Sequence, residues 1–198
     1  NQEFREFIDD NGYSRAELWQ MEGWEWVKSV KAKAPFYWFE KDSKWYTYQT
    51  NGVQEVNLNE TVTHINFYEA EAFARWKGMR LLTEPEWEVL AQQYGKVTTH
   101  SHFQEATHFH PRVARENQLF GTAWEWTNSA YLPFPFYEQE KGALGEYNGK
   151  FMINQMVLKG GSCATPQSHF RPSYRNFFHP HLQWQFTGIR LAKKQTSS

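Results

Sequence analysis

The sequence contains a single cysteine, Cys163, among 198 residues, which excludes an internal disulfide and the small secreted domains that disulfides hold together. Neither sign of charge is in excess, because 21 Lys and Arg stand against 22 Asp and Glu, for a formal net charge of -1. This balance excludes the basic surface typical of nucleic-acid-binding proteins and offers no Lys/Arg run to an anionic membrane. The sequence also lacks an apolar run of membrane-spanning length and a signal peptide pattern at its start. We therefore expect a cytoplasmic protein with no nucleic-acid partner and no membrane partner.

Aliphatic residues are also few relative to aromatic residues. Aromatic residues make up 18% of the chain and include ten Trp, although the mean hydropathy is -0.79. This composition favours a core built from large rings, in a fold with much irregular structure. At 198 residues, a single domain with one sizeable core is the default expectation.

Helix starts are marked by capping boxes, in which a Ser, Thr or Asn side chain and a Glu three residues later satisfy the free N–H groups of the first turn. The pattern occurs in three places: Ser14 with Glu17, Asn66 with Glu69, and Thr83 with Glu86. The second and third boxes predict helices over residues 67–77 and 84–94, which Gly78 and Gly95 would end. A further helix is indicated at the start of the chain by apolar residues spaced for one face: Phe4, Phe7 and Ile8.

Strands are expected in three places. Residues 36–48 are rich in aromatic side chains that alternate along the sequence, with a turn at residues 41–43. Shorter strands are indicated at Met156–Lys159 and at residues 186–191.

Two segments show no periodic pattern. Residues 95–118 are interpreted as a polar loop. Residues 128–155 form a long segment broken by proline and glycine. A segment of that length without regular structure in a compact domain is typically functional.

Two motifs in the middle of the chain carry a recognisable signature. The first, A-R-W-K-G-M-R-L-L-T-E-P-E-W-E, covers residues 74–88, and the second, G-T-A-W-E-W-T, covers residues 121–127. Both are similar to motifs of the formylglycine-generating enzymes, whose fold is a variant of the C-type lectin fold. We interpret both as scaffold: the first as two helices with a capped connection, the second as core packing of the alternating Trp124 and Trp126.

Four further motifs lie towards the end of the chain: G-E-Y-N-G-K-F-M at 145–152, V-L-K-G-G-S-C-A-T-P at 157–166, Y-R-N-F-F at 174–178 and W-Q-F-T-G-I-R-L-A at 184–192. Together they resemble the C-terminal part of the EgtB family, the sulfoxide synthases of ergothioneine biosynthesis, and the resemblance covers essentially the whole chain. It implies an α+β fold of C-type-lectin type, with short strands, two to three helices and much irregular structure. It also implies that residues 1–198 are one formylglycine-generating-enzyme-like domain, the C-terminal domain of a longer protein.

Enzymes of this family use non-haem Fe(II) and O2 to join a sulfur donor to hercynine, an N-trimethylated histidine. The resemblance therefore implies hercynine, O2 and either cysteine or γ-glutamylcysteine as small-molecule substrates, and an iron-dependent oxidoreductase as the parent protein. In the family, three histidines of a separate N-terminal helical domain hold the iron, typically as H-x-x-x-H-x-E plus one further His. That spacing is absent from this sequence. We therefore expect the Fe(II) ligands to belong to a partner domain outside this chain, and the chain alone to be inactive.

Six of the eight histidines of this chain form H-x-H pairs instead. The pairs are His100 with His102, His108 with His110, and His179 with His181. Although H-x-H can chelate a metal, all three pairs fall in segments interpreted as loops, and we predict no metal site from them.

The segment after Arg175 carries the candidate substrate-binding residues. In one branch of the family this segment is Asn-Trp-Asp, where the Asn hydrogen-bonds the substrate histidine and the ring lies near its trimethylammonium group. By this resemblance, Asn176 keeps the amide and Phe177 keeps a π-face that attracts a quaternary ammonium. Phe178 stands where that branch has a carboxylate.

The same branch uses a Tyr before a Pro, in the loop after W-E-W-T, as its proton donor. Phe134 stands at the nearest equivalent position and cannot donate a proton, so we keep it only as a candidate substrate-binding residue. The weak candidates for the catalytic donor in this chain are Tyr131 and Tyr137, and a Tyr of the missing domain is the alternative. Phe134 lacks the hydroxyl and Phe178 lacks the carboxylate found in the γ-glutamylcysteine-using branch. These two differences argue against that branch and favour free cysteine or another compound as the sulfur donor.

Other functions remain open beside this one. A non-catalytic lectin-like binding module would also lack an iron motif, and ovothiol-type and selenoneine-type synthases are close variants of the favoured enzyme. A formylglycine-type oxidase needs two copper-binding cysteines, and the corresponding positions hold Thr165 and Phe170, which argues against that activity. We interpret Cys163 as a buried small apolar residue.

Overall fold

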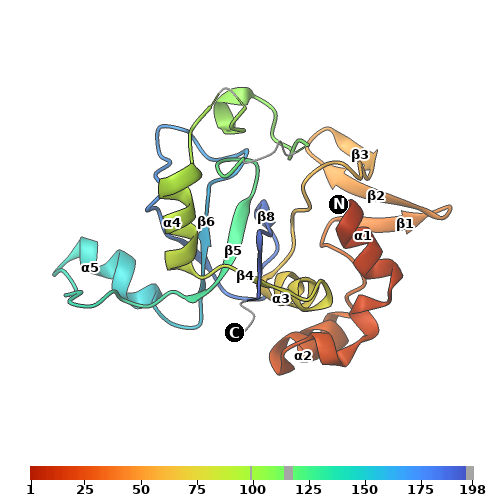
Figure 1. The fold of residues 1–198 in the computed structure, drawn as a ribbon, viewed down its shortest axis with the longest axis horizontal. Coiled ribbons are helices and arrows are strands. Elements are labelled where there is room, and N and C mark those ends of the chain that lie inside the picture. Colours follow the sequence, from red (N-terminus) through yellow and green to blue (C-terminus); the bar gives the residue numbers. More distant parts are fainter. Residues whose placement is uncertain (99, 114–117, 195–198) are drawn as a thin grey trace.

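In the computed structural model of the chain, residues 1–98, 100–113 and 118–194 are described (Figure 1). The helices are α1 (Gln2–Asp9), α2 (Met21–Val30), α3 (Phe67–Trp76), α4 (Glu84–Tyr94) and α5 (Ala143–Asn148). The strands are β1 (Trp38–Lys41), β2 (Lys44–Gln49), β3 (Gly52–Glu55), β4 (Met79–Leu81), β5 (Trp124–Ala130), β6 (Met156–Lys159), β7 (Asn176–Phe178), β8 (Thr187–Gly188) and β9 (Leu191–Lys193). Single 3-10 turns lie at Gly12–Ser14, Ala16–Leu18, Gln104–Ala106 and Gly149–Phe151.

The strands form three small sheets within the described residues. One sheet has the order β1-β2-β3, a second pairs β4 with β9, and the central sheet has the order β7-β6-β5-β8. Strand β5 runs antiparallel to β6 and parallel to β8. Figure 1 shows α4 beside the central sheet and α3 near the lower end of β8, with the β1–β3 sheet and α5 at opposite sides of the molecule. The α+β prediction is confirmed, although the described residues form five helices rather than two to three.

Two of the predicted capping boxes are present. The Asn66 side chain accepts from the Glu69 backbone N–H, and the Glu69 carboxylate accepts from the Asn66 N–H. Thr83 and Glu86 form the same reciprocal pair at the start of α4. Helix α4 has the predicted bounds, and α3 ends one residue earlier than expected. Gly78 follows α3 at a φ of 67°, the left-handed conformation that glycine adopts without strain.

The helix start predicted at Ser14 is wrong. Ser14 ends a 3-10 turn, and the next α-helix, α2, begins only at Met21. The indole N–H of Trp19 donates to the Gly12 carbonyl at 2.9 Å, which folds this segment into tight turns. Glu17, the expected partner in the box, instead accepts from Arg15 at 2.9 Å.

The strands predicted from short continuous stretches of sequence are present in the structure at two of the three expected places. Strands β1 and β2 occupy residues 38–49, one residue beyond the predicted range, and turn at Asp42 and Ser43, which both have positive φ. Strand β6 has the predicted bounds. The strand expected at residues 186–191 is wrong as a single element, because this run is divided between β8 in the central sheet and β9 beside β4.

The segments interpreted as loops contain more structure than their composition indicates. In residues 95–118, Phe103 and His102 are buried, and a 3-10 turn follows them. In residues 128–155, β5 continues to Ala130 and α5 forms near the middle of the segment. Residues 99 and 114–117 of the predicted polar loop lie outside the described residues.

The core is aromatic, as the composition predicted. Phe4, Phe7 and Phe73 bring α1 and α3 together, with ring centroids 5.2 to 6.0 Å apart. Trp126 is 1% exposed, and its indole N–H donates to the Ile65 carbonyl at 3.0 Å, so the polar end of the ring is satisfied. In the part of the chain that the structure describes, no helix has both the length and the apolar character that crossing a bilayer requires.

Residues of the two central motifs hold this scaffold together. Arg80 donates two hydrogen bonds to the Glu86 carboxylate, at 2.7 and 2.8 Å. Glu125 accepts from the Trp87 indole at 2.7 Å and forms an ion pair with Arg190 at 2.7 Å. Helix α4 is therefore fixed to β5 by a hydrogen bond that lies inside the core.

Candidate functional site

Strand β7 carries three adjacent candidate residues at the edge of the central sheet. It pairs with β6 in antiparallel orientation. Because side chains alternate along a strand, Asn176 and Phe178 point to one face of the sheet and Phe177 points to the other. The Phe178 ring packs against Trp184, with centroids 5.3 Å apart, and contributes to the core. The three residues are therefore neighbours in sequence but do not form one continuous pocket wall.

Phe177 belongs to an aromatic stack. Its ring lies parallel to Tyr131, with centroids 4.1 Å apart and an interplanar angle of 9°. The ring of Phe151 is tilted against it at 5.6 Å. The π-face that the resemblance assigns to a substrate ammonium is thus partly occupied by neighbouring rings of the protein.

Arg175 links this stack to α4. Its guanidinium lies 4.7 Å from the ring centroid of Tyr131 and 4.2 Å from that of Phe134. The same guanidinium donates to both carboxylate oxygens of Glu84, at 2.7 and 2.9 Å. Because a bidentate pair fixes both the position and the plane of the guanidinium, the two rings rest on a cation held in place by α4.

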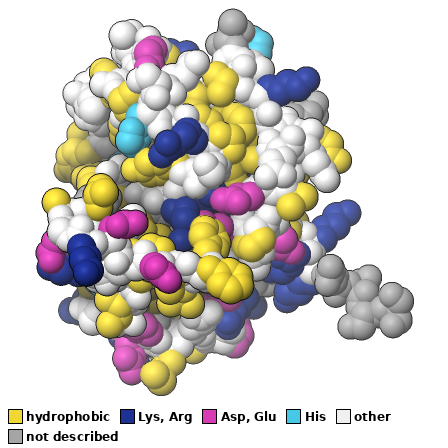
Figure 2. All heavy atoms as spheres, turned by 90° about the vertical axis from the view of Figure 1, so that its left-hand side faces the viewer, with side chains coloured by type: hydrophobic (Ala, Val, Ile, Leu, Met, Phe, Trp, Pro, Cys, Tyr) yellow, Lys and Arg dark blue, Asp and Glu magenta, His cyan; other side chains and the backbone are white. Residues whose placement is uncertain are grey.

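A second cation is buried beside this pair. The Lys159 side chain is 0% exposed, and its Nζ donates to Glu88 at 2.7 Å and lies 3.8 Å from Glu84. Burial lowers the pKa of Lys159, and the carboxylate of Glu88 opposes that shift. We call Arg175, Glu84, Lys159 and Glu88 the charged cluster. Figure 2 shows this side of the molecule, over α4 and α5, with basic and acidic side chains next to one another among hydrophobic ones.

The sequence analysis missed the charged cluster, although the sequence contained a signal for it. Lys159 falls in the strand predicted at Met156–Lys159, and a lysine in a buried strand requires an acidic partner. Glu84 and Glu88 are four residues apart on the predicted helix and therefore share one face of it.

Asn176 retains hydrogen-bonding capacity towards a ligand. Its side-chain carbonyl accepts from the Phe177 backbone N–H at 3.0 Å, and the side chain is half-buried. Among the described residues, the structure gives its amide nitrogen no hydrogen-bond partner. That group can donate to a ring nitrogen or a carboxylate of a bound molecule.

The two candidate proton donors lie in different environments. Tyr131 is 4% exposed, belongs to the stack with Phe177, and donates from its hydroxyl to Asn148 at 3.3 Å. Tyr137 is 39% exposed, and its backbone N–H donates to the Phe134 carbonyl at 3.1 Å. The structure therefore brings Tyr131, Phe134 and Phe177 together around Arg175.

The histidine pairs are engaged in other contacts. His102 is buried, and its Nε2 lies 2.7 Å from the His108 carbonyl oxygen. Nε2 of His110 lies 3.2 Å from Oε2 of Glu60. Among the described residues, no group of three or more His, Cys, Asp or Glu side chains could hold a metal ion. This part of the chain therefore does not fit an Fe(II) site of its own.

His64 predicts a pH dependence of stability. Its ring packs between Tyr37 and Phe186, with centroid distances of 4.7 and 4.8 Å, and burial lowers its pKa from 6.5 to about 4. As the pH falls through 6.5, the unfolded chain binds a proton that the folded protein does not bind until about pH 4. The stabilisation by neutral His64 is therefore present above pH 6.5 and is lost towards pH 4, an amount on the order of 3 kcal/mol.

Replacing His64 with Asn is expected to remove this dependence. Asn is a suitable substitute because position 64 has a φ of 60°, a left-handed conformation that Asn tolerates. Urea unfolding between neutral pH and pH 4 should show a steeper loss of unfolding free energy in the wild type than in His64→Asn. Parallel curves for the two proteins would contradict the prediction.

The positions relevant to a formylglycine-type oxidase are packed inside the protein. Cys163 is 0% exposed, and burial raises its pKa to about 12, so the thiol stays protonated at neutral pH. Thr165 accepts a hydrogen bond from the Ser162 backbone N–H at 3.0 Å. Phe170 packs against Phe120, with centroids 4.7 Å apart. A hydroxyl and a ring thus stand where that chemistry requires two thiolates.

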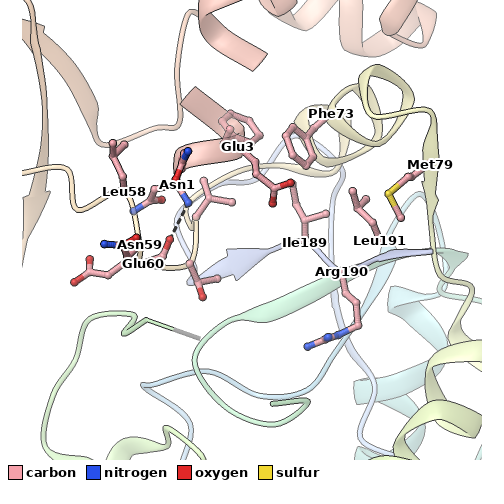
Figure 3. Close-up of a pocket in the computed structure, with 14 residues that line it drawn as sticks. Asn1, Glu3, Leu58, Asn59, Glu60, Phe73, Met79, Ile189, Arg190 and Leu191 are labelled. Atoms are coloured by element: carbon pink, nitrogen blue, oxygen red, sulfur yellow. Dashed lines mark hydrogen bonds between the residues drawn. The ribbon is translucent and has the colours of Figure 1, made fainter. Parts of the chain in front are cut away.

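A cavity of about 570 Å³ lies where α1 meets residues 58–62 and 189–191 (Figure 3). The amino group of Asn1 donates to the Glu60 carbonyl at 2.7 Å on one side of it. The candidate residues of β7 and of residues 131–137 do not line this cavity, so it is separate from the site described above.

The class of the domain follows from these features. Short strands in curled sheets, helices outside them and buried ion pairs between motifs form an α+β fold that is consistent with the C-type-lectin-like fold. The family model of the sulfatase-modifying factor enzyme 1-like domain matches residues 1–118 and 106–195. The chain belongs to this family.

Individual relatives are consistent with this assignment. The chain is 31% identical over 219 residues to a hercynine oxygenase of Mycolicibacterium smegmatis and 29% identical over 218 residues to one of Mycobacterium tuberculosis. Each alignment covers 97% of this chain and 50% of the relative, so the chain spans about half the length of these curated relatives. It is also 28% identical over 177 residues to the inactive C-alpha-formylglycine-generating enzyme 2 of Mus musculus, covering 67% of this chain and 56% of that protein. The similarity to hercynine oxygenases along nearly the whole chain confirms the resemblance found in the motifs.

Proposed function

We propose that this chain is the substrate-binding domain of a sulfoxide synthase that joins a cysteine-type thiol to hercynine in ergothioneine biosynthesis. The observation that carries the proposal is the match over 97% of the chain to relatives named hercynine oxygenase. The Asn176 amide, available at the edge of β7, supports it because it can hydrogen-bond the imidazole of a histidine derivative. Fe(II), held by residues elsewhere in the protein, would supply the O2 chemistry.

This chain would contribute substrate binding and orientation. The amide of Asn176 would hydrogen-bond the imidazole of hercynine at the edge of β7. Because Phe177 points to the opposite face of that strand, Phe177 and Phe134 would form an aromatic wall that borders a different part of the substrate. Because Tyr131 and Arg175 already pack on these rings, the wall is rigid before a substrate arrives. A preformed wall loses little side-chain freedom on binding.

The structure also bears on the proton donor and the sulfur donor. Of the two tyrosines, Tyr131 is the better candidate for a proton donor, because it lies within the stack of Phe177 while Tyr137 is more exposed. Phe178 is partly buried against the core and against Trp184, and it offers no carboxylate to a second substrate. The lack of a carboxylate at Phe178, together with Phe134 at the position of the family's Tyr, favours free cysteine, or another small thiol, over γ-glutamylcysteine.

The test is steady-state kinetics of sulfoxide formation by the native polypeptide that contains this chain, with iron and O2 supplied. Asn176→Ala is expected to raise the apparent KM for hercynine at least about tenfold, because one hydrogen bond to a buried polar substrate is lost. The iron content should not change, because Asn176 is not proposed as a metal ligand.

Asn128→Ala is the matched control, because Asn128 is an exposed Asn on β5, which is separated from β7 by β6 in the same sheet. It should leave the hercynine KM at the wild-type value. Wild-type kinetics in Asn176→Ala would remove Asn176 from the pocket, and absence of sulfoxide formation by the iron-loaded wild type would remove the proposed activity.

We further propose that residues 1–198 act as the C-terminal domain of a longer cytoplasmic protein, with an iron-binding domain before them. The twofold greater length of the hercynine oxygenases supports this organisation. The intact mass of the polypeptide in its source cells tests it. A mass roughly double 23.6 kDa is expected, and a mass near 23.6 kDa would contradict the proposal.

A second candidate function is a non-catalytic lectin-like binding module. The specific observation in its favour is the mouse relative, which is named inactive and aligns with 67% of this chain. The two candidates differ in a simple assay. Hercynine binding without turnover in the iron-loaded native protein would favour the module, whereas turnover would favour the synthase.

A further inference from the structure

A second cavity, of about 350 Å³, opens on a different part of the surface. We call it the aromatic cavity, because five aromatic side chains line it: Tyr37, Tyr48, Phe109, Trp184 and Phe186. Two imidazoles, those of His64 and His110, complete the ring lining. None of the β7 candidate residues and none of the charged cluster belongs to it.

The rings of the aromatic cavity come from four separate segments that are fixed to one another. The Tyr48 N–H donates to the Tyr37 carbonyl at 3.2 Å, which ties together the two strands of the first hairpin. The His64 ring contacts both Tyr37 and Phe186, at 4.7 and 4.8 Å, and so joins the hairpin to the end of the chain. Gln49 lies 2.7 Å from Nε2 of His110, which attaches the segment after Gln104–Ala106. The lining is therefore preformed.

The mouth of the aromatic cavity is open to solvent. Tyr48 is 57% exposed, Trp184 54% and Phe109 42%, although all three are large rings. Tyr48 packs against Phe39, with ring centroids 5.0 Å apart, and Trp184 packs against Phe178, at 5.3 Å, so the exposed sides of these rings are what a molecule from solution can contact. In the charged cluster, by contrast, the guanidinium of Arg175 already covers Tyr131 and Phe134.

The aromatic cavity carries little charge of its own. Among the described residues that line it, none is Lys, Arg, Asp or Glu. Burial lowers the pKa of His64 and of His110 to about 4, so both imidazoles are neutral at pH 7. The Glu60 carboxylate lies 3.2 Å from Nε2 of His110. Glu60 itself does not line the aromatic cavity. A positive ligand would therefore meet aromatic rings without a competing cation in the described lining.

We propose that the aromatic cavity is a binding site for a small quaternary ammonium compound. The face of an aromatic ring attracts such a cation electrostatically, and several rings around one cavity add their effects. A volume of about 350 Å³ is at the small end of the range for ligand sites, which fits a compact methylated ammonium group with a short substituent. This site shares no lining residue with the site of the proposed function. Because Trp184 packs against Phe178, Tyr48→Leu is the variant that tests the aromatic cavity alone, so either site can fail without the other.

The first test compares choline with its uncharged carbon isostere, 3,3-dimethylbutan-1-ol, in NMR titrations that observe the ligand in the presence of the native polypeptide containing this chain. Both have the same shape, so a difference in affinity reports the charge. Choline is expected to bind roughly threefold to thirtyfold more tightly than the isostere, which is the range of a cation–π contribution. Its N-methyl resonance should also move upfield, because the methyl groups would lie over ring faces.

Two substitutions assign the binding to the aromatic cavity. Trp184→Leu and Tyr48→Leu should each weaken choline binding by roughly threefold or more, because each removes one ring from the lining. Tyr94→Leu is the matched control, because Tyr94 is 65% exposed and lies outside the cavity. Asn176→Ala should likewise leave the choline affinity unchanged, which separates this site from that of the proposed function.

Three outcomes would overturn the proposal. The first is no choline binding at millimolar concentration, and the second is equal affinity for choline and its isostere, which would indicate an ordinary apolar pocket. The third is choline binding that neither Trp184→Leu nor Tyr48→Leu weakens relative to Tyr94→Leu.

Discussion

Glu84→Gln is expected to lower the free energy of unfolding by about 3 kcal/mol, because removal of one member of a buried ion pair leaves the other charge uncompensated. Glu84 is 3% exposed and accepts two hydrogen bonds from Arg175, at 2.7 and 2.9 Å. An amide offers only one acceptor, and its NH2 group would face the guanidinium. Lys159 would keep Glu88 but lose the second carboxylate near its ammonium group. The charged cluster would then hold two cations and one anion.

Urea unfolding measures this loss, and the midpoint should fall while the slope with urea stays the same. Glu55→Gln is the matched control, because Glu55 pairs with Lys44 at 2.9 Å with both side chains more than half exposed. An exposed pair contributes less than about 1 kcal/mol. Equal losses for the two variants would mean that the Glu84–Arg175 pair is solvated and does not support the aromatic stack.

Gly121→Ala is expected to lower the free energy of unfolding by roughly 3 kcal/mol or more, because strain and a backbone clash act together. Gly121 has a φ of 82°, a conformation that alanine adopts only with strain. A Cβ there would lie 2.5 Å from the carbonyl oxygen of His102 and 2.7 Å from its backbone nitrogen. Neither atom can move without breaking the hydrogen bond from Thr122 N–H to the His102 carbonyl, which is 2.8 Å long.

Gly78→Ala separates the two causes. Gly78 has a φ of 67°, but nothing lies within 4 Å of a Cβ placed there. Only the strain remains, and the expected loss is about 1 kcal/mol. Thermal or urea unfolding measures the free energy of unfolding of both variants. If Gly121→Ala lowers it no more than Gly78→Ala does, the segment around His102 moves to accommodate the Cβ, and the prediction is wrong.

The sequence correctly predicted the helices and strands that are determined by residues close together in the chain. The capping boxes at Asn66 and Thr83 lie within four residues, and the bounds of α3 and α4 follow from them. The box at Ser14 shows the limit of such reasoning, because the Trp19 side chain folds that segment into turns. The division of residues 186–191 between two sheets depends on pairing with the distant strands β5 and β4, which no local pattern displays.

The candidate site was predictable only in part, for the same reason. The resemblance of the Y-R-N-F-F motif named Asn176 and Phe177, but it gave no indication that Tyr131 would stack on Phe177. The pair between Arg175 and Glu84 joins residues far apart in the chain and exists only once α4 packs beside the central sheet. The aromatic cavity draws its rings from four segments, so it is visible only in the folded protein.

The division of the last strands between two sheets has a consequence for synthesis in the cell. Strand β8 completes the central sheet beside β5, and β9 completes the small sheet beside β4. Arg190, between them, forms the ion pair with Glu125. The central sheet is whole only once Gly188 has left the ribosome, and the small sheet only once Lys193 has done so. We therefore expect both sheets to be completed late in the translation of this domain, because long-range strand pairing must wait for its last partner.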